Sequence, residues 1–119
     1  MRVELVAPDR LLWEGQATFV FARTTAGEIG ILPRHIPLVA ELVAGEMVRI
    51  DPVDGEEMHA AVHGGFLSVT ERGVTILAEA AELANEIDVE QANLDFQSDD
   101  EDVRTKARAR LRAAGHSPV

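Results

Sequence analysis

Short apolar stretches broken by turn residues follow one another from Arg2 to about Glu82. The stretches are Val3–Ala7, Leu11–Trp13, Ala17–Ala22, Glu46–Ile50, Met58–Val62, Phe66–Val69 and Val74–Leu77. β-Branched and aromatic residues outnumber good helix formers in several of them, which favours strands. The Asp54-Gly55 pair between two of the stretches predicts a tight hairpin, because glycine adopts a positive φ without steric cost. Closely spaced strands of this kind are typical of an all-β sandwich or barrel.

The pattern becomes helical near the C-terminus. Residues 78–84 fit either the start of a helix or the end of a sheet, and a strand is favoured. Asp88, with Gln91 three residues later, is a candidate N-cap for a short helix. Ser98 and Glu101 form a second capping pattern, after which apolar residues recur at helical spacing until Gly115. We therefore predict a β-domain over residues 1–85 and a short helical hairpin over residues 86–119.

The charges of the two parts are opposite. The net charge of the 119-residue chain is −10, and all 21 acidic residues lie at or before Asp102. Residues 1–102 carry a net charge of −15, whereas the five basic residues that follow carry +5. An acidic body repels phosphate backbones, so nucleic-acid binding by the β-domain is disfavoured. The basic second helix offers one large apolar residue, Leu111, so we expect its docking to be marginal and reversible.

Composition narrows the class of protein further. Apolar residues make up 46% of the chain, which is enough for a folded core. The chain has no cysteine, and therefore neither disulfides nor a thiolate metal site. It has no signal-peptide pattern and no apolar run long enough to span a bilayer, so we expect a soluble cytoplasmic protein.

Candidate catalytic groups do not assemble into a known constellation. His59 and His63 lie four residues apart in a predicted strand, about 13 Å along one face, so they do not share one metal ion. His116 is expected to be solvated in the terminal segment. The serines lack a nucleophile motif, and the acids at 99–102 suit the first turn of a helix better than a cation site. A small β-barrel enzyme is therefore disfavoured.

The segment from Ala26 to Leu38 differs from the rest of the chain. Its two glycines and two prolines punctuate an apolar run, which indicates a rigid excursion between strands. We interpret this excursion as a contact surface. The alternative is a buried crossover whose prolines only turn the chain.

This segment also carries a family resemblance. The runs GEIGILPRHIPLVAEL, GEMVRI, VHGGFLSV, GVTILAEAAE and IDVEQA, between Val3 and about Ala92, resemble in order and spacing the epsilon subunit of bacterial F-type ATP synthases. The resemblance implies a flattened ten-stranded β-sandwich followed by a helical hairpin, without catalytic residues. It also implies a rotor subunit on the cytoplasmic face of the bacterial plasma membrane, which touches the membrane only through the Fo sector.

The resemblance further implies partners and site residues. The expected partners are the gamma subunit, the c ring and, transiently, the alpha/beta catalytic head, and the isolated chain is expected to be a monomer. By motif position, the residues expected to face the polar loops of the c ring are Glu28, Ile31, Leu32, Arg34 and His35. The regulatory part of the tail, expected to restrain ATP hydrolysis, comprises Val103, Arg104, Arg108, Leu111 and Arg112.

Two departures from the family pattern change these expectations. Family members usually have glycine where this chain has Arg34, which suggests a side-chain contact in place of a close backbone approach. Some relatives bind ATP through an I/L-D-x-x-R-A motif, in which this chain has Gln91 in place of arginine. Asp88, Gln91 and Ala92 would then form at most a weak nucleotide site, and no other cofactor is implied. A small ATP-sensing regulatory domain is the alternative function.

Overall fold

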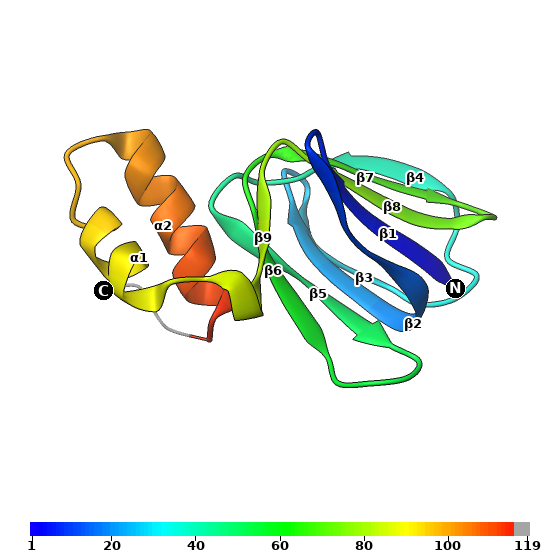
Figure 1. The fold of residues 1–119 in the computed structure, drawn as a ribbon. Helices are drawn as coiled ribbons and strands as arrows, with labels where there is room; N and C mark the ends of the chain where they lie inside the picture. Colours follow the sequence, from blue (N-terminus) through cyan, green and yellow to red (C-terminus); the bar gives the residue numbers. More distant parts are fainter. Residues whose placement is uncertain (116–119) are drawn as a thin grey trace.

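Alternation of buried and exposed residues along the strands builds a two-layered β-sandwich in the computed structural model, which describes residues 1–115 (Figure 1). His116, which we expected to be solvated, lies outside the described residues. Nine strands lie within the described part of the chain: β1 (Arg2–Ala7), β2 (Arg10–Thr24), β3 (Gly27–Ile31), β4 (Leu38–Glu41), β5 (Glu46–Pro52), β6 (Met58–Val62), β7 (Gly65–Thr70), β8 (Gly73–Ala78) and β9 (Ala81–Leu83). This confirms the predicted β-sandwich, with nine strands where the resemblance implied ten.

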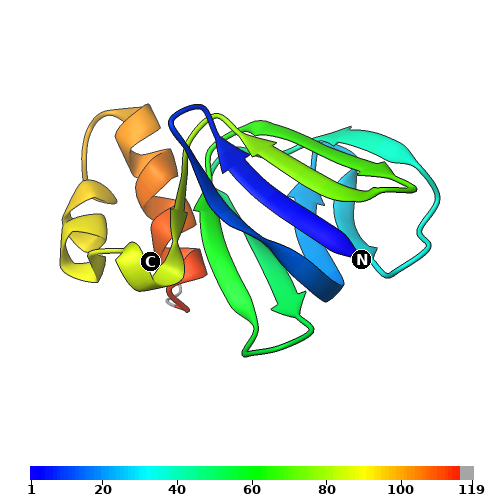
Figure 2. The same cartoon turned by 45° about the vertical axis from the view of Figure 1, so that its right-hand side comes forward.

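The long strand β2 joins the two layers. One layer has the order β4-β7-β8-β1-β2, and the other contains β3, β2, β5, β6 and β9 (Figure 2). The first half of β2 pairs with β1, and its second half pairs with β3 and β5. The sequence pattern predicted two separate strands here, because Glu14-Gly15 interrupts the apolar run. The structure keeps one continuous strand that changes layer.

The core lies between the layers and is aliphatic. Its largest fully buried side chains in the sandwich include Leu5, Ile31, Ile50, Leu67 and Ile76. Burying one such side chain contributes about 1.5–3 kcal/mol, so the sandwich contains most of the apolar stabilisation of the chain.

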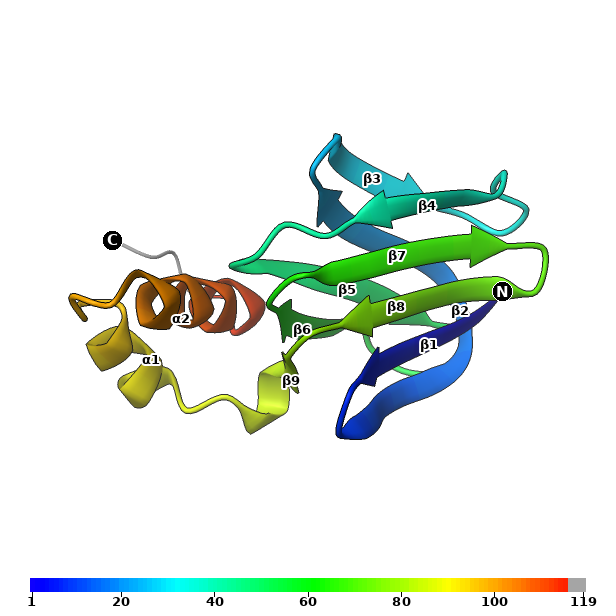
Figure 3. The same ribbon diagram turned by 90° about the horizontal axis from the view of Figure 1, so that it is seen from above.

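Nearly half of the predicted excursion over residues 26–38 is in fact strand. Gly27–Ile31 forms β3 beside β2, and Leu38–Glu41 forms β4 beside β7, which leaves only residues 32–37 as a loop. Glycine hides the alternation of β3, since Gly30 lies against the ring of Phe19 and a Cβ there would be 3.0 Å from that ring. The loop and the β7–β8 turn lie at the end of the sandwich opposite the helices (Figure 3).

Two α-helices follow a short 3₁₀ turn, η1 (Ala84–Glu86). Asp88 caps α1 (Val89–Asp95) as predicted, accepting from the Gln91 amide at 3.1 Å. The predicted Ser98 cap of the second helix is wrong. Asp100 caps α2 (Glu101–Ala113), because its carboxylate accepts from two amides of the first turn, while Ser98 accepts from the Asp100 amide.

The C-terminal end of α2 is as predicted. Gly115 has φ +83°, and its amide donates to the carbonyl of Arg112 at 3.1 Å. Glycine adopts this left-handed conformation readily, so it ends the helix. None of the helices within residues 1–115 is both long and apolar enough to cross a membrane.

Candidate functional site

The β3–β4 loop presents three of the five residues expected to face a partner. Leu32 is 61% exposed, Arg34 is exposed and His35 is half-buried. The His35 amide donates to the carbonyl of Leu32 at 3.1 Å, which closes a turn around Arg34. Arg34 has φ +71°, the one positive φ at a non-glycine position in the described residues. The backbone therefore follows a path that suits glycine, and the arginine adds a cation to it at a conformational cost of about 1–2 kcal/mol.

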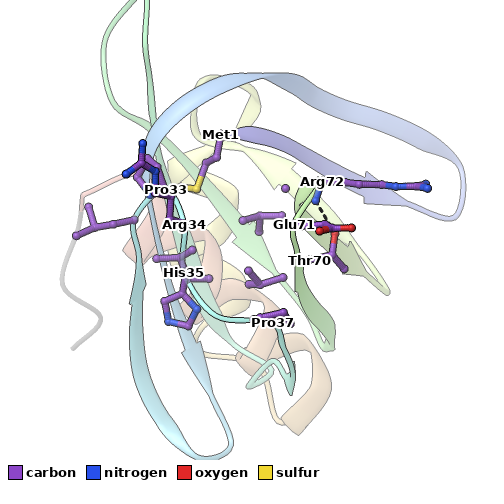
Figure 4. Close-up of a pocket in the computed structure, with 13 residues that line it drawn as sticks. Met1, Pro33, Arg34, His35, Pro37, Thr70, Glu71 and Arg72 are labelled. Atoms are coloured by element: carbon purple, nitrogen blue, oxygen red, sulfur yellow. Dashed lines mark hydrogen bonds between the residues drawn. The ribbon is translucent and has the colours of Figure 1, made fainter.

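A cavity of about 430 Å³ lies between this loop and the β7–β8 turn (Figure 4). Pro33 and Pro37 line one side, residues 70–73 line the other, and Met1 lies between them. The cavity combines apolar walls with charged groups, a combination typical of surfaces that receive side chains of another protein.

The other two residues expected to face a partner, Ile31 and Glu28, lie in different environments. Ile31 is fully buried in the core, so the prediction that its side chain faces a partner is wrong. Alternation along β3 explains this, because Ile31 points to the core while exposed Leu32 opens the loop. Glu28 lies at the opposite end of β3, about 10 Å from Ile31, with its side chain 61% exposed and 3.3 Å from Arg23.

An outer apolar row on the first layer was missed by the sequence analysis. It consists of directly paired residues on β7, β8, β1 and β2, namely Phe66, Leu77, Val6 and Leu11. Phe66, Leu77 and Leu11 are 50–52% exposed, and Val6 is half-buried. Apolar residues in consecutive positions, such as Phe66-Leu67 and Ile76-Leu77, were the available signal, because they break the alternation expected of a solvated face. Contiguous exposed apolar residues mark interaction surfaces.

The β4–β5 turn contacts α2 directly. Arg108 donates to the carbonyls of Gly45 at 3.3 Å and Ala44 at 3.4 Å. Gly45 has φ +80°, and a Cβ there would lie 2.5 Å from Arg108 and 2.8 Å from Thr105. Only glycine combines this backbone conformation with so close an approach of the helix.

Ion pairs join the basic side of α2 to the acidic sandwich. Arg112 donates to the carboxylate of Glu46 at the start of β5. Arg110 lies 2.5 Å from Glu82 on β9 and 3.5 Å from Asp95 on α1. Arg104 instead donates to the Ser98 carbonyl at 2.7 Å, within the helical part of the chain. Arg110 and Arg112 of the helix therefore pair with carboxylates of the acidic sandwich.

Small residues bring α2 close to the sheet. Leu111 is buried, as are Ala107, Ala109 and Ala113, so both sides of the helix are covered. Ala109 and Ala113 form a small cluster with Ala61 of β6, flanked by Met47 and Ile87. Val103, expected in the regulatory set, is half-buried in the first turn. The helix thus buries more surface than the single leucine suggested, although each alanine adds little.

The histidines form contacts of a structural kind. His63 lies 3.0 Å from Asp102 of α2, and Lys106 lies 3.1 Å from the same carboxylate. Lys106, by hydrogen bonding and charge, holds the pKa of Asp102 below its usual value, and His63 adds to this effect. His59 lies 3.3 Å from Glu57. Within residues 1–115, no three metal-ligating side chains gather into a site.

The residues at the positions of the relatives' ATP-binding motif make local contacts within the helical part of this chain. The Asp88 carboxylate caps α1, Gln91 donates to Asp95 at 2.8 Å, and Ala92 is fully buried. These contacts give Asp88 and Ala92 structural roles in the docked helical hairpin.

Comparisons with known proteins identify relatives over nearly the whole chain. Residues 1–84 match the family model described as ATP synthase, Delta/Epsilon chain, beta-sandwich domain. The chain is 60% identical to the ATP synthase epsilon chain of Mycolicibacterium vanbaalenii, over 97% of this chain and 95% of that protein. It is 58% identical to the epsilon chain of Mycobacterium avium, with the same coverage. A chain in the cryo-EM structure of the Euglena gracilis mitochondrial ATP synthase, OSCP/F1/c-ring, superposes with a TM-score of 0.68 at 27% identity, covering 96% of this chain and 80% of that one.

Proposed function

From the premise that this chain belongs to the ATP synthase epsilon chain family, whose members are non-catalytic central-stalk subunits, we propose that it couples c-ring rotation to ATP synthesis through gamma and restrains ATP hydrolysis through its C-terminal helices. The observation that carries the regulatory part is the docked α2. It is attached to the sandwich mainly by ion pairs and small side chains, contacts that a partner surface can replace.

The outer apolar row is the proposed gamma contact. Its four residues lie on adjacent strands about 4.8 Å apart, which gives a stripe roughly 14 Å long. A stripe of this size suits the apolar part of a protein interface, and truncation of an aromatic anchor commonly weakens such an interface by more than 1 kcal/mol. Phe66→Ala is therefore expected to weaken binding to isolated gamma at least fivefold, whereas Val53→Ala, an exposed apolar residue outside the row, is expected to leave it unchanged.

The c-ring contact is proposed for both ends of β3, through Glu28 at one end and Leu32, Arg34 and His35 at the other. Glu28→Lys and Arg34→Glu are expected to weaken coupling between proton flow and ATP synthesis without unfolding the chain, because exposed substitutions usually change stability by less than about 0.5 kcal/mol. Synthesis and proton pumping in membrane vesicles are the readouts. Folded variants with normal coupling would exclude the corresponding end of β3 from the contact.

The restraint of hydrolysis is tested by deleting residues 103–119. We expect higher ATPase activity in the assembled enzyme, because this segment supplies the basic residues proposed to reach the catalytic head. Rates are compared with the full chain at low and high salt, since exposed ion pairs weaken as salt rises. Equal rates at both salt concentrations, with the shortened chain still bound to the enzyme, would leave a coupling subunit without an inhibitory role.

The proposed location is the cytoplasmic face of the bacterial plasma membrane, with membrane contact only through the Fo sector. The alternative of an ATP-sensing domain has less support, because the motif residue at position 91 is glutamine and Asp88 already caps α1. Calorimetric titration of the isolated chain with ATP tests it. Binding in the micromolar range would restore this alternative.

A further inference from the structure

Four charged side chains connect the β2–β3 hairpin to α2. Glu28 on β3 lies 3.3 Å from Arg23 on β2, and Arg23 lies 3.5 Å from Glu46 at the start of β5. Glu46 in turn accepts a hydrogen bond from Arg112 in the last turn of α2. We call this set, Glu28, Arg23, Glu46 and Arg112, the charge chain.

Glu46, in the middle of the charge chain, is shielded from solvent, whereas its partner Arg23 is 40% exposed. The Glu46 side chain is 12% exposed, whereas that of Glu28 is 61% exposed. The second carboxylate oxygen of Glu46 and the Nε of Arg23 are buried, and neither has a hydrogen-bond partner among the described residues. Buried polar atoms normally have partners, so Arg23 is divided between two carboxylates and fully satisfies neither.

We infer that the charge of Glu28 controls how firmly α2 docks on the sandwich, through Arg23 and Glu46. The other members of the charge chain, Glu28, Arg23 and Glu46, give a net charge of −1 beside Arg112. When Glu28 is neutralised, the net charge becomes zero, and Arg23 is free to move closer to the Glu46 oxygen from which it now lies 3.5 Å. Both changes weaken the attraction for Arg112, and the burial of Glu46 limits how far solvent screens them.

This coupling connects two distinct places on the surface. One is the exposed carboxylate of Glu28, and the other is the contact between α2 and the β4–β5 turn. A partner that brings a cation to Glu28 therefore favours release of α2, and release of α2 changes the affinity of Glu28 for that partner by the same factor. The coupling is a property of the isolated chain and holds whichever partner meets Glu28.

Amide hydrogen exchange of α2 in the isolated full-length chain tests this inference. Exchange of the amides over residues 105–113 is compared in the wild type, Glu28→Gln, Arg112→Ala and the double variant. We expect Glu28→Gln to accelerate exchange about two- to fivefold when Arg112 is present, the range for one partly exposed ion pair. In the Arg112→Ala background we expect no further acceleration, because the last member of the charge chain is gone.

Glu14→Gln is the matched control. Glu14 is also an exposed carboxylate bound by a strand arginine, lying 2.9 Å from Arg2, and it has no ion pair to α2 among the described residues. Equal exchange in the wild type and Glu28→Gln would overturn the inference. So would equal acceleration by Glu14→Gln, which would indicate a general effect of net charge, or an undiminished effect of Glu28→Gln without Arg112.

Discussion

Replacing Leu111 by alanine should loosen α2 while leaving the sandwich folded. Leu111 is 1% exposed and is the one large apolar side chain that the helix buries fully. Leucine-to-alanine changes at buried sites cost about 2–5 kcal/mol, depending on how far the surroundings collapse into the cavity. A surface helix relaxes readily, so we expect a value near 2 kcal/mol, which corresponds to roughly a 30-fold change in the equilibrium for local opening of α2.

Hydrogen exchange measured by NMR resolves this change residue by residue. Amides of α2 should exchange about 30-fold faster in Leu111→Ala, whereas central amides of β5, such as those of Val48 and Ile50, should keep their protection. Leu94→Ala is the matched control, because Leu94 lies on the neighbouring helix and is 65% exposed. This control should change exchange by no more than about twofold.

Two results would refute the reasoning. Acceleration of less than about threefold in α2 would mean that burial of Leu111 does not hold this helix in place. Equal loss of protection in β5 would mean that α2 and the sandwich unfold as one unit, and the helix would then be part of the core.

Three further predictions concern the fold. A chain cut after Asn85 should keep a cooperative thermal melt within a few degrees of the full chain, because the sandwich holds most of the large buried residues; a fall of tens of degrees would contradict this. Arg34→Gly should be neutral or stabilising by up to about 1 kcal/mol in urea unfolding, since glycine removes the left-handed strain, whereas β-branched Arg34→Val should destabilise; equal effects would contradict it. Hydrogen bonds from Arg10 lower the pKa of Glu86 to about 2, so the stability that this pair contributes is present above about pH 4.5 and is lost as the pH falls towards 2. Glu86→Gln should therefore flatten the pH dependence of the free energy of unfolding between these values. An unchanged profile would exclude the pair as the cause of that dependence.

The strands were predictable where one face alternates cleanly. The Asp88 cap and the hairpin at Asp54-Gly55 follow from local backbone chemistry, although the hairpin connection spans residues 53–57 and is longer than the tight turn predicted. Strand β3 was not predicted, because Gly30 makes room for the Phe19 ring of a neighbouring strand and thereby erases the alternation. Its partner β2 lies directly before it in the chain, across the turn at residues 25–26, so the missed signal was a local one.

The candidate site was predictable in part. The unusual loop around Arg34 was visible in the sequence, but the burial of Ile31 depends on which face of β3 meets the core. The acidic body and basic tail were evident from composition, whereas the pairing of Arg112 with Glu46 requires the long-range docking of α2 on β5. The outer apolar row likewise appears only once the register of four strands is known.

The coupling role itself is tested most directly by ATP-driven proton pumping in inverted membrane vesicles that lack this chain. Adding the purified full-length chain should restore pumping in proportion to the ATP hydrolysed, because the chain is proposed to connect gamma to the c ring. Phe66→Ala, which weakens the proposed gamma contact, should restore less pumping at the same added concentration. Vesicles that pump equally well with and without the chain would contradict the proposed coupling function.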